Sequence, residues 1–197
     1  LSRWLEVGAK TRARASAPSA PAETVRTRAL AHHEPGEVVT LQTGAWREDR
    51  PRGPRFGTLV HAVLAEIPFD AEAPIIHTLA RTHARLLGAT DAEVEAAAQS
   101  VGVALKHPIF ERAAASPNCR REVAVTNLAA DGVVIEGVVD LAFLEEDPFG
   151  DSVWTVVDYK TDLGAGAPPE YVAQVRLYAT AIAEATGLPT EAVLLAV

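Results

Sequence analysis

Gly137-Val138-Val139-Asp140 and Val156-Val157-Asp158-Tyr159-Lys160 are the two stretches that decide the fold of this chain. Each is an apolar, β-branched run that predicts a strand, and each ends in charged residues. A buried strand does not normally accept an unpaired carboxylate, because desolvation costs several kcal/mol unless a cation or a proton neutralises it. These charged strand ends therefore indicate a site that holds a cation.

Alternation along a strand places Asp158 and Lys160 on one face and Tyr159 on the opposite face. If Asp140 lies on a neighbouring strand, two carboxylates converge beside an ammonium group. Hard oxygen ligands suit Mg²⁺ or Mn²⁺, and such a metal with a lysine can assist hydrolysis of a phosphodiester. For either segment alone, the alternative is a solvated strand end that enters a turn.

Two further motifs flank these strands. The full series, in chain order, is Gly57-Thr58-Leu59-Val60-His61, Gly137-Val138-Val139-Asp140, Asp158-Tyr159-Lys160-Thr161-Asp162 and Gln174-Val175-Arg176-Leu177-Tyr178. Over about residues 55–197 this series resembles the RecB-like branch of the PD-(D/E)xK nuclease superfamily, in particular the AddA-type domain at the C-terminus of UvrD-family helicase subunits. The resemblance implies an α/β (α+β), restriction-endonuclease-like fold, with a mixed central sheet of about four or five strands, flanking helices and a helical insert.

The resemblance also implies an activity and partners. The domain would be a Mg²⁺-dependent deoxyribonuclease, with Mn²⁺ as a substitute, acting as an exonuclease in double-strand-break repair and recombination. Its DNA would be single-stranded ends, delivered by a helicase motor on the same polypeptide, and a second, AddB-like subunit would complete the assembly.

The site residues follow from the matching motif positions. The resemblance implies that the metal is bound by His61, Asp140, Asp158 and the backbone carbonyl of Tyr159. The catalytic residues would be Asp140, Asp158 and Lys160, with Lys160 positioning or deprotonating the attacking water. Gln174 and Tyr178, four apart on one helical face, would hold the DNA.

Several of these residues have a second interpretation. A lone histidine beside an apolar helical stripe, as His61 is, is often a core or boundary residue. Gln174 and Tyr178 could form a polar stripe next to the core. Glu122 matches an accessory acidic position of the first strand, and a strand-edge salt bridge with Arg120 or Arg121 explains it equally well.

Composition narrows the class of protein. The one cysteine, Cys119, excludes an iron-sulfur cluster, which needs four cysteines and which AddB-type relatives contain. The net charge of −8 predicts weak DNA binding by the domain alone, although half of the 18 basic residues fall within the first 52 positions. No secretory signal and no apolar run of membrane-spanning length are present in the sequence, which predicts a cytoplasmic protein.

The domain boundary is predicted near residue 55. Residues 1–55 form a partly irregular N-terminal extension, with an Ala- and Pro-rich linker over 13–22 and one strand candidate over 38–41, and residues 56–197 form the nuclease domain. The basic residues of the extension either touch DNA or belong to a solvated linker. The absence of methionine predicts that the domain is part of a larger protein.

The pattern of the main domain predicts helices over 57–67, 73–88, 90–106 and 168–186, with a short helix ending at 115. Strands are predicted from 120, over 133–144, over 153–161 and over 191–197. Asp131-Gly132 predicts a hairpin between the first two. Two other functions fit the same fold: a catalytically inactive DNA-binding or scaffolding module, and a free-standing repair or restriction-type nuclease.

Overall fold

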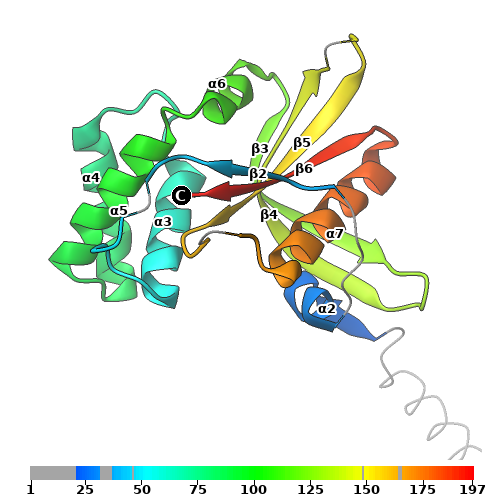
Figure 1. Ribbon diagram of the computed structural model, residues 1–197, viewed down its shortest axis with the longest axis horizontal. Coiled ribbons are helices and arrows are strands. Elements are labelled where there is room, and N and C mark those ends of the chain that lie inside the picture. The colour runs from blue at the N-terminus through cyan, green and yellow to red at the C-terminus, as the bar shows by residue number, and fades with distance from the viewer. Residues whose placement is uncertain (1–20, 32–36, 46, 148, 164–165) are drawn as a thin grey trace, which may run out of the picture.

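The computed structural model describes residues 21–31, 37–45, 47–147, 149–163 and 166–197, and these form one mixed sheet with helices on both faces (Figure 1). The strands are β1 (Ala22–Thr24), β2 (Val39–Gln42), β3 (Cys119–Leu128), β4 (Val134–Glu146), β5 (Ser152–Lys160) and β6 (Thr190–Ala196). The helices are α2 (Val25–Ala31), α3 (Pro54–Glu66), α4 (Ala73–Leu87), α5 (Asp91–Ala104), α6 (Pro108–Ala115) and α7 (Pro169–Thr186).

The sheet has the order β1-β4-β5-β6-β2, with β3 paired to β4. The β3–β4 hairpin is antiparallel and turns at Gly132, whose φ of 81° suits glycine. β5 is antiparallel to β4, whereas β6 runs parallel to β5 and β2 runs parallel to β6. The predicted neighbouring positions of the second and third strands of the main domain are thereby confirmed.

One edge of β4 is shared by two strands. β5 pairs with the second half, from Leu141 onward, and the short β1 pairs in parallel with residues 134–136. In the described part of the chain, residues 137–140 have no strand partner on that edge, because the β1–β4 pairing ends at Glu136 and the β4–β5 pairing begins only at Leu141. The Gly137–Asp140 motif therefore lies where the sheet splits.

The helices begin and end where local chemistry directs them. Pro54, Pro74 and Pro108 lie in the first turns of α3, α4 and α6, where a missing N–H costs nothing. α4 ends at Gly88 with φ 65°. α5 begins with a capping box, in which Thr90 and Glu93 are bonded to each other's backbone.

Two apolar clusters cover the two faces of the sheet. Helices α3 to α6 pack on one face around Tyr159 and Phe110, and α7 with α2 packs on the other around Tyr178 and Val175 (Figure 1). Burial of these faces is the main contribution to folding. The residues around Asp140 and Asp158, described in the next subsection, lie between α3 on one face and α7 on the other.

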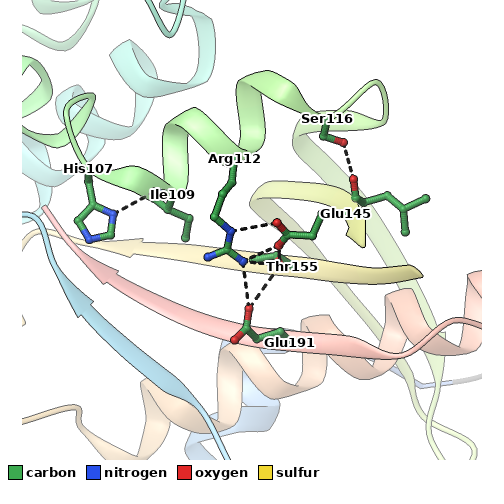
Figure 2. Close-up of polar contacts among 8 residues, drawn as sticks. His107, Ile109, Arg112, Ser116, Glu145, Thr155 and Glu191 are labelled. Carbon is green, nitrogen blue, oxygen red and sulfur yellow. Dashed lines mark hydrogen bonds and ion pairs between the residues drawn. The ribbon is translucent and has the colours of Figure 1, made fainter. Parts of the chain in front are cut away.

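A polar cluster fixes α6 to the far end of the sheet. Arg112 of α6 donates to Glu145 of β4 at 2.9 Å and lies 3.4 Å from Glu191 of β6, and Thr155 of β5 donates to Glu145 at 2.5 Å (Figure 2). One guanidinium thus joins three strands. Its planar, multidentate donor set suits this role better than a lysine would.

Most predicted elements are confirmed within one to three residues, and the described sheet has six strands rather than four or five. Upstream of residue 55, the strand predicted over 38–41 is β2, but β1 and α2 were not predicted. Residues 13–20 of the linker predicted over 13–22 lie outside the described residues. Among the described helices, none is long and apolar enough to cross a membrane.

Candidate active site

The split in the sheet brings the two motif aspartates together. Asp140 is at the unpaired stretch of β4 and Asp158 is on β5, just beyond the last β4–β5 pair, Leu141 with Val157. Both carboxylates are buried. Because the strands separate here, the side chains lie in the opening between them rather than against a flat ladder.

The β3–β4 ladder also switches faces at this point. Arg121 and Leu141 lie on the α3 side, whereas Val123 and Val139 belong to the α7 side. Simple alternation would put residues two apart on one strand, such as Arg121 and Val123, on the same face. The residue between Arg121 and Val123, Glu122, has φ 49°, in the left-handed region. This local twist directs Asp140, which lies opposite Glu122, toward α3.

Asp140 is bonded on both of its oxygens. Oδ1 lies 3.0 Å from Nδ1 of His61 on α3, and Oδ2 accepts the backbone N–H of Tyr159 at 2.6 Å. Burial alone would lower the pKa of His61, but the hydrogen bond and charge of Asp140 raise it above its ordinary value. The Tyr159 ring packs edge-on to His61 and limits its orientation.

Asp158 is held less completely. Its Oδ2 lies 2.6 Å from Nζ of Lys160, in a buried ion pair, and accepts no hydrogen bond from any other described residue. Burial raises the pKa of Asp158 to about 6, and the charge of Asp140 adds to the shift, against the effect of Lys160. A buried carboxylate in this condition is stabilised by a further positive charge.

Lys160 has two other neighbours, both on α7. It donates to Oε1 of Gln174 at 3.0 Å, and its Nζ lies 4.4 Å from the centre of the Tyr171 ring, a cation–π distance. Gln174 in turn donates to the hydroxyl of Tyr178 at 3.2 Å. The ammonium is therefore fixed from three directions.

Two motif glycines allow this close packing. A Cβ on Gly137 would lie 2.6 Å from the Tyr178 ring and 2.9 Å from Val25, and a Cβ on Gly57 would lie 3.1 Å from the Thr161 hydroxyl. The first glycine lets α7 and α2 approach β4. The second lets the start of α3 approach the end of β5, which brings His61 toward Lys160 and Asp158.

The site opens onto a cleft with a volume of about 590 Å³. His61, Tyr159, Lys160 and Gln174 line it, together with parts of α2, the loop before α3 and the first turn of α7. Tyr178, in contrast, is only 5% exposed and lies against Gly137 in the core. Of the two residues expected to hold DNA, Gln174 alone faces the cleft.

Glu122 lies near Asp140 and His61, and no hydrogen bond to either is found among the described contacts. Its side chain is exposed, and burial together with the charge of Asp140 raises its pKa, whereas His61 opposes the shift. No ion pair of Glu122 with Arg120 or Arg121 is found among the described contacts, since Arg121 instead donates to carbonyls at the end of α3 and stacks on Phe69.

The donor types suit a divalent cation, although the side chains are not pre-arranged around one. In the described ranges, no three His, Cys, Asp or Glu side chains form a group that could bind a metal directly. The reason is local: Asp140 is engaged by His61 and Asp158 by Lys160. The fit comes from two buried carboxylates, an adjacent imidazole and a carboxylate oxygen of Asp158 that, in the described part of the chain, is contacted by Lys160 alone.

Sequence reasoning missed several residues of this region. Tyr171 and Thr161 showed no ligand-like spacing on their own, and Arg50 lay in the predicted N-terminal extension, residues 1–55. Arg50 is buried and donates to the carbonyls of Val197, at 2.8 Å, and of Thr161, which fixes the segment after Lys160. A buried-arginine role has no sequence signal, because its partners are backbone carbonyls distant in the chain.

None of the curated proteins matches this chain. The family model of the PD-(D/E)XK nuclease superfamily matches residues 37–197, which include Asp140, Asp158 and Lys160 in the order that gives the superfamily its name. The mixed sheet and its flanking helices agree with the restriction-endonuclease-like fold of that group. The chain therefore belongs to the PD-(D/E)XK nuclease superfamily.

Proposed function

We propose that this domain is a Mg²⁺-dependent deoxyribonuclease that hydrolyses single-stranded DNA ends. Members of the superfamily are typically nucleases, and its nucleases use divalent metals, usually Mg²⁺. The observation that carries the proposal is the arrangement around Asp158, whose buried carboxylate lies 2.6 Å from the ammonium of Lys160, a residue that lines the cleft.

His61, Asp140, Asp158 and the backbone carbonyl of Tyr159 are the groups that would hold the metal. When bound there, Mg²⁺ polarises the scissile phosphate and makes a water more acidic. The Tyr159 N–H and the edge-on Tyr159 ring keep Asp140 and His61 in place. Glu122, exposed beside Asp140, is the accessory carboxylate of this proposal.

Lys160 acts on the phosphate side of the site. Its ammonium, fixed by Gln174 and the Tyr171 ring, positions the attacking water and offsets the charge that develops on the phosphorane oxygens. Gln174 lines the cleft and contacts the strand. Tyr178 supports this contact indirectly, because its hydroxyl accepts from the Gln174 amide and fixes the orientation of that group.

The wider context of the proposal is an AddA-type helicase-nuclease. The order of the motifs resembles that of the AddA-type branch. The single cysteine of this chain agrees with a domain that needs no iron-sulfur cluster. In this proposal the full protein is cytoplasmic and acts in double-strand-break repair and recombination. It carries a helicase motor upstream of the nuclease and pairs with an AddB-like subunit, so its coding sequence should contain helicase motifs upstream of residue 1.

Cleavage of an end-labelled single-stranded oligonucleotide tests the activity. The wild type should cut with Mg²⁺ and stop with EDTA, and Asp158→Ala should lose cleavage. Asp70→Ala, which removes an exposed carboxylate on the loop after α3, is the matched control and should cut normally. Equal rates for wild type and Asp158→Ala would exclude the assignment, and calorimetry that finds no tight Mn²⁺ site would favour a scaffolding module.

A further inference from the structure

Part of the cleft wall is formed by residues that precede the region matched by the superfamily model. Arg26, Ala29 and Leu30 of α2 line the cleft, and the superfamily match begins only at residue 37. The short helix therefore adds to the site something that the matched domain alone does not supply.

α2 is firmly fixed in this position. Val25 and Ala29 are buried, and Val25 packs near Tyr178 over Gly137. Arg28 donates to Asp131 of the β3–β4 turn at 2.7 Å, and β1 adds three backbone pairs to β4. A wall anchored on one side by apolar packing and on the other by an ion pair keeps the width of the cleft constant.

The face that α2 turns to the cleft has two chemical parts. Arg26 and Leu30 are four residues apart and so share one helical face, adjacent to the buried Val25–Ala29 stripe. Both are exposed, Leu30 to 60%, so each side chain is accessible to a ligand in the cleft. A cation and an apolar side chain side by side match the phosphate and the base of one nucleotide.

The arginines of the cleft favour a phosphate backbone. Arg26 and Arg52 line it together with Lys160, whose charge is offset by Asp158 at 2.6 Å, and the acidic residues in the lining are Asp162 and Glu170. Asp162 accepts a hydrogen bond from the Tyr171 hydroxyl at 2.8 Å. In a chain with a net charge of −8, these two arginines supply positive charge at the cleft that attracts a phosphate backbone.

We infer that α2 forms a single-strand subsite, in which Arg26 and Arg52 contact phosphates of a DNA strand and Leu30 contacts a base. This inference rests on the proposed nuclease function and adds the selectivity for single strands. A cleft of about 590 Å³ has the size of a pocket for a small organic molecule, which matches about one or two nucleotides of a single strand. In a duplex the bases are paired and stacked, so Leu30 would find no free base to contact.

Binding measured in EDTA tests the subsite independently of cleavage. The probe is a fluorescent oligothymidine, and the readout is its dissociation constant over a range of salt concentrations. Arg26→Gln should weaken binding several-fold and make the slope of log K against log salt shallower by about 0.7, the value for one lost phosphate contact to a single strand. Leu30→Ser should weaken binding with the slope unchanged, because it removes no charge.

Two variants on α4, outside the cleft lining, are the matched controls. Arg81→Gln and Leu86→Ser change exposed residues of the same types and should bind like the wild type. Thermal unfolding of all variants checks that α2 remains docked. A blunt duplex of mixed sequence should bind more weakly than a mixed-sequence single strand, and Arg26→Gln should not alter its affinity.

The outcomes separate the subsite from the activity. If Arg26→Gln keeps the wild-type affinity and salt slope, or if the duplex binds as tightly as the single strand, the subsite is excluded, whatever Asp158→Ala does to cleavage. If Arg26→Gln loses binding as described while Asp158→Ala still cuts, the subsite stands and the assignment of the catalytic residues fails.

Discussion

At the scale of single residues, Lys160 is the most constrained charge of the site. It contacts a carboxylate, an amide oxygen and an aromatic ring, all within a few ångströms. These contacts suit a compact ammonium on a flexible stem. A planar guanidinium needs a different geometry and effectively never gives up its proton.

Lys160→Arg separates two roles of this residue. If Lys160 only balanced the carboxylates, arginine would preserve both metal binding and cleavage. In the proposed mechanism the ammonium contacts the water and the phosphate, so we expect divalent-metal affinity within a few-fold of wild type and a rate reduced on the order of a hundredfold. A metal titration beside a cleavage time course measures both, and near wild-type cleavage would reduce Lys160 to a counter-charge.

At the scale of the elements, the distortion of β3 at Glu122 is what turns Asp140 toward α3. A non-glycine residue in the left-handed region costs on the order of 1–3 kcal/mol, and it persists only where the surrounding structure requires it. Here the requirement is the change of faces between Arg121 and Val123 on β3. The strain and the site are therefore parts of one local feature.

Glu122→Gly should remove this strain. Glycine normally weakens a strand by about 0.5–1 kcal/mol, but at φ 49° it relieves a larger cost. We expect the free energy of unfolding of Glu122→Gly to equal or exceed that of the wild type. The control Arg120→Gly, at an exposed position of the same strand with no positive φ, should be less stable by about 1 kcal/mol. Equal losses for both variants in urea unfolding would contradict the account.

The start of α5 gives a pH-dependent prediction. Hydrogen bonds from Arg55 and from the backbone of Thr90 lower the pKa of Glu93 from 4.5 to about 2. Glu93 thus stabilises the fold fully above pH 4.5, and this contribution is lost as the pH falls toward 2. Glu93→Gln keeps the capping-box acceptor but loses the ion pair with Arg55, so it should cost up to about 1 kcal/mol at neutral pH and progressively less as the pH falls. Glu95→Gln, an exposed change on the same helix, should show no such trend in urea unfolding.

At the scale of the whole molecule, distant segments meet at Arg50. Its guanidinium lies between the end of β6, the segment after β5 and α5, where it also lies 3.4 Å from the Ser100 hydroxyl. The loop that carries Arg50 connects β2 to α3, so one side chain joins the sheet, the helical side and the residue after Lys160.

Arg50→Met should therefore be costly. The apolar stem remains, but the carbonyls of Val197 and Thr161 lose their donor, and a buried polar group without a partner costs about 1–3 kcal/mol. We expect a loss on the order of 3 kcal/mol in urea unfolding, with reduced cleavage at temperatures where the variant is still folded. Arg47→Met, an exposed change nearby, should be neutral, and an equally stable Arg50→Met would show that water replaces the guanidinium.

Most elements of this protein, β1 and α2 excepted, followed from its sequence, because periodicity, caps and turn residues are local. The capping box of Thr90 and Glu93, the Asp131-Gly132 turn and the apolar runs before Asp140 and Asp158 each act within a few residues. The motif order also indicated the superfamily, which the match over residues 37–197 shows. The metal and DNA roles assigned to individual residues stay predictions.

The arrangement of the site was decided only in three dimensions. The sheet splits at residues 137–140, beyond the end of the β4–β5 pairing, while β5 continues alongside β6, and the faces switch beside Glu122, whose φ is positive. Burial of α2 depends on a groove that opens only because Gly137 lacks a side chain, so Val25 and Ala29 alone gave no signal. These features arise from contacts between segments far apart in the chain, which no local pattern encodes.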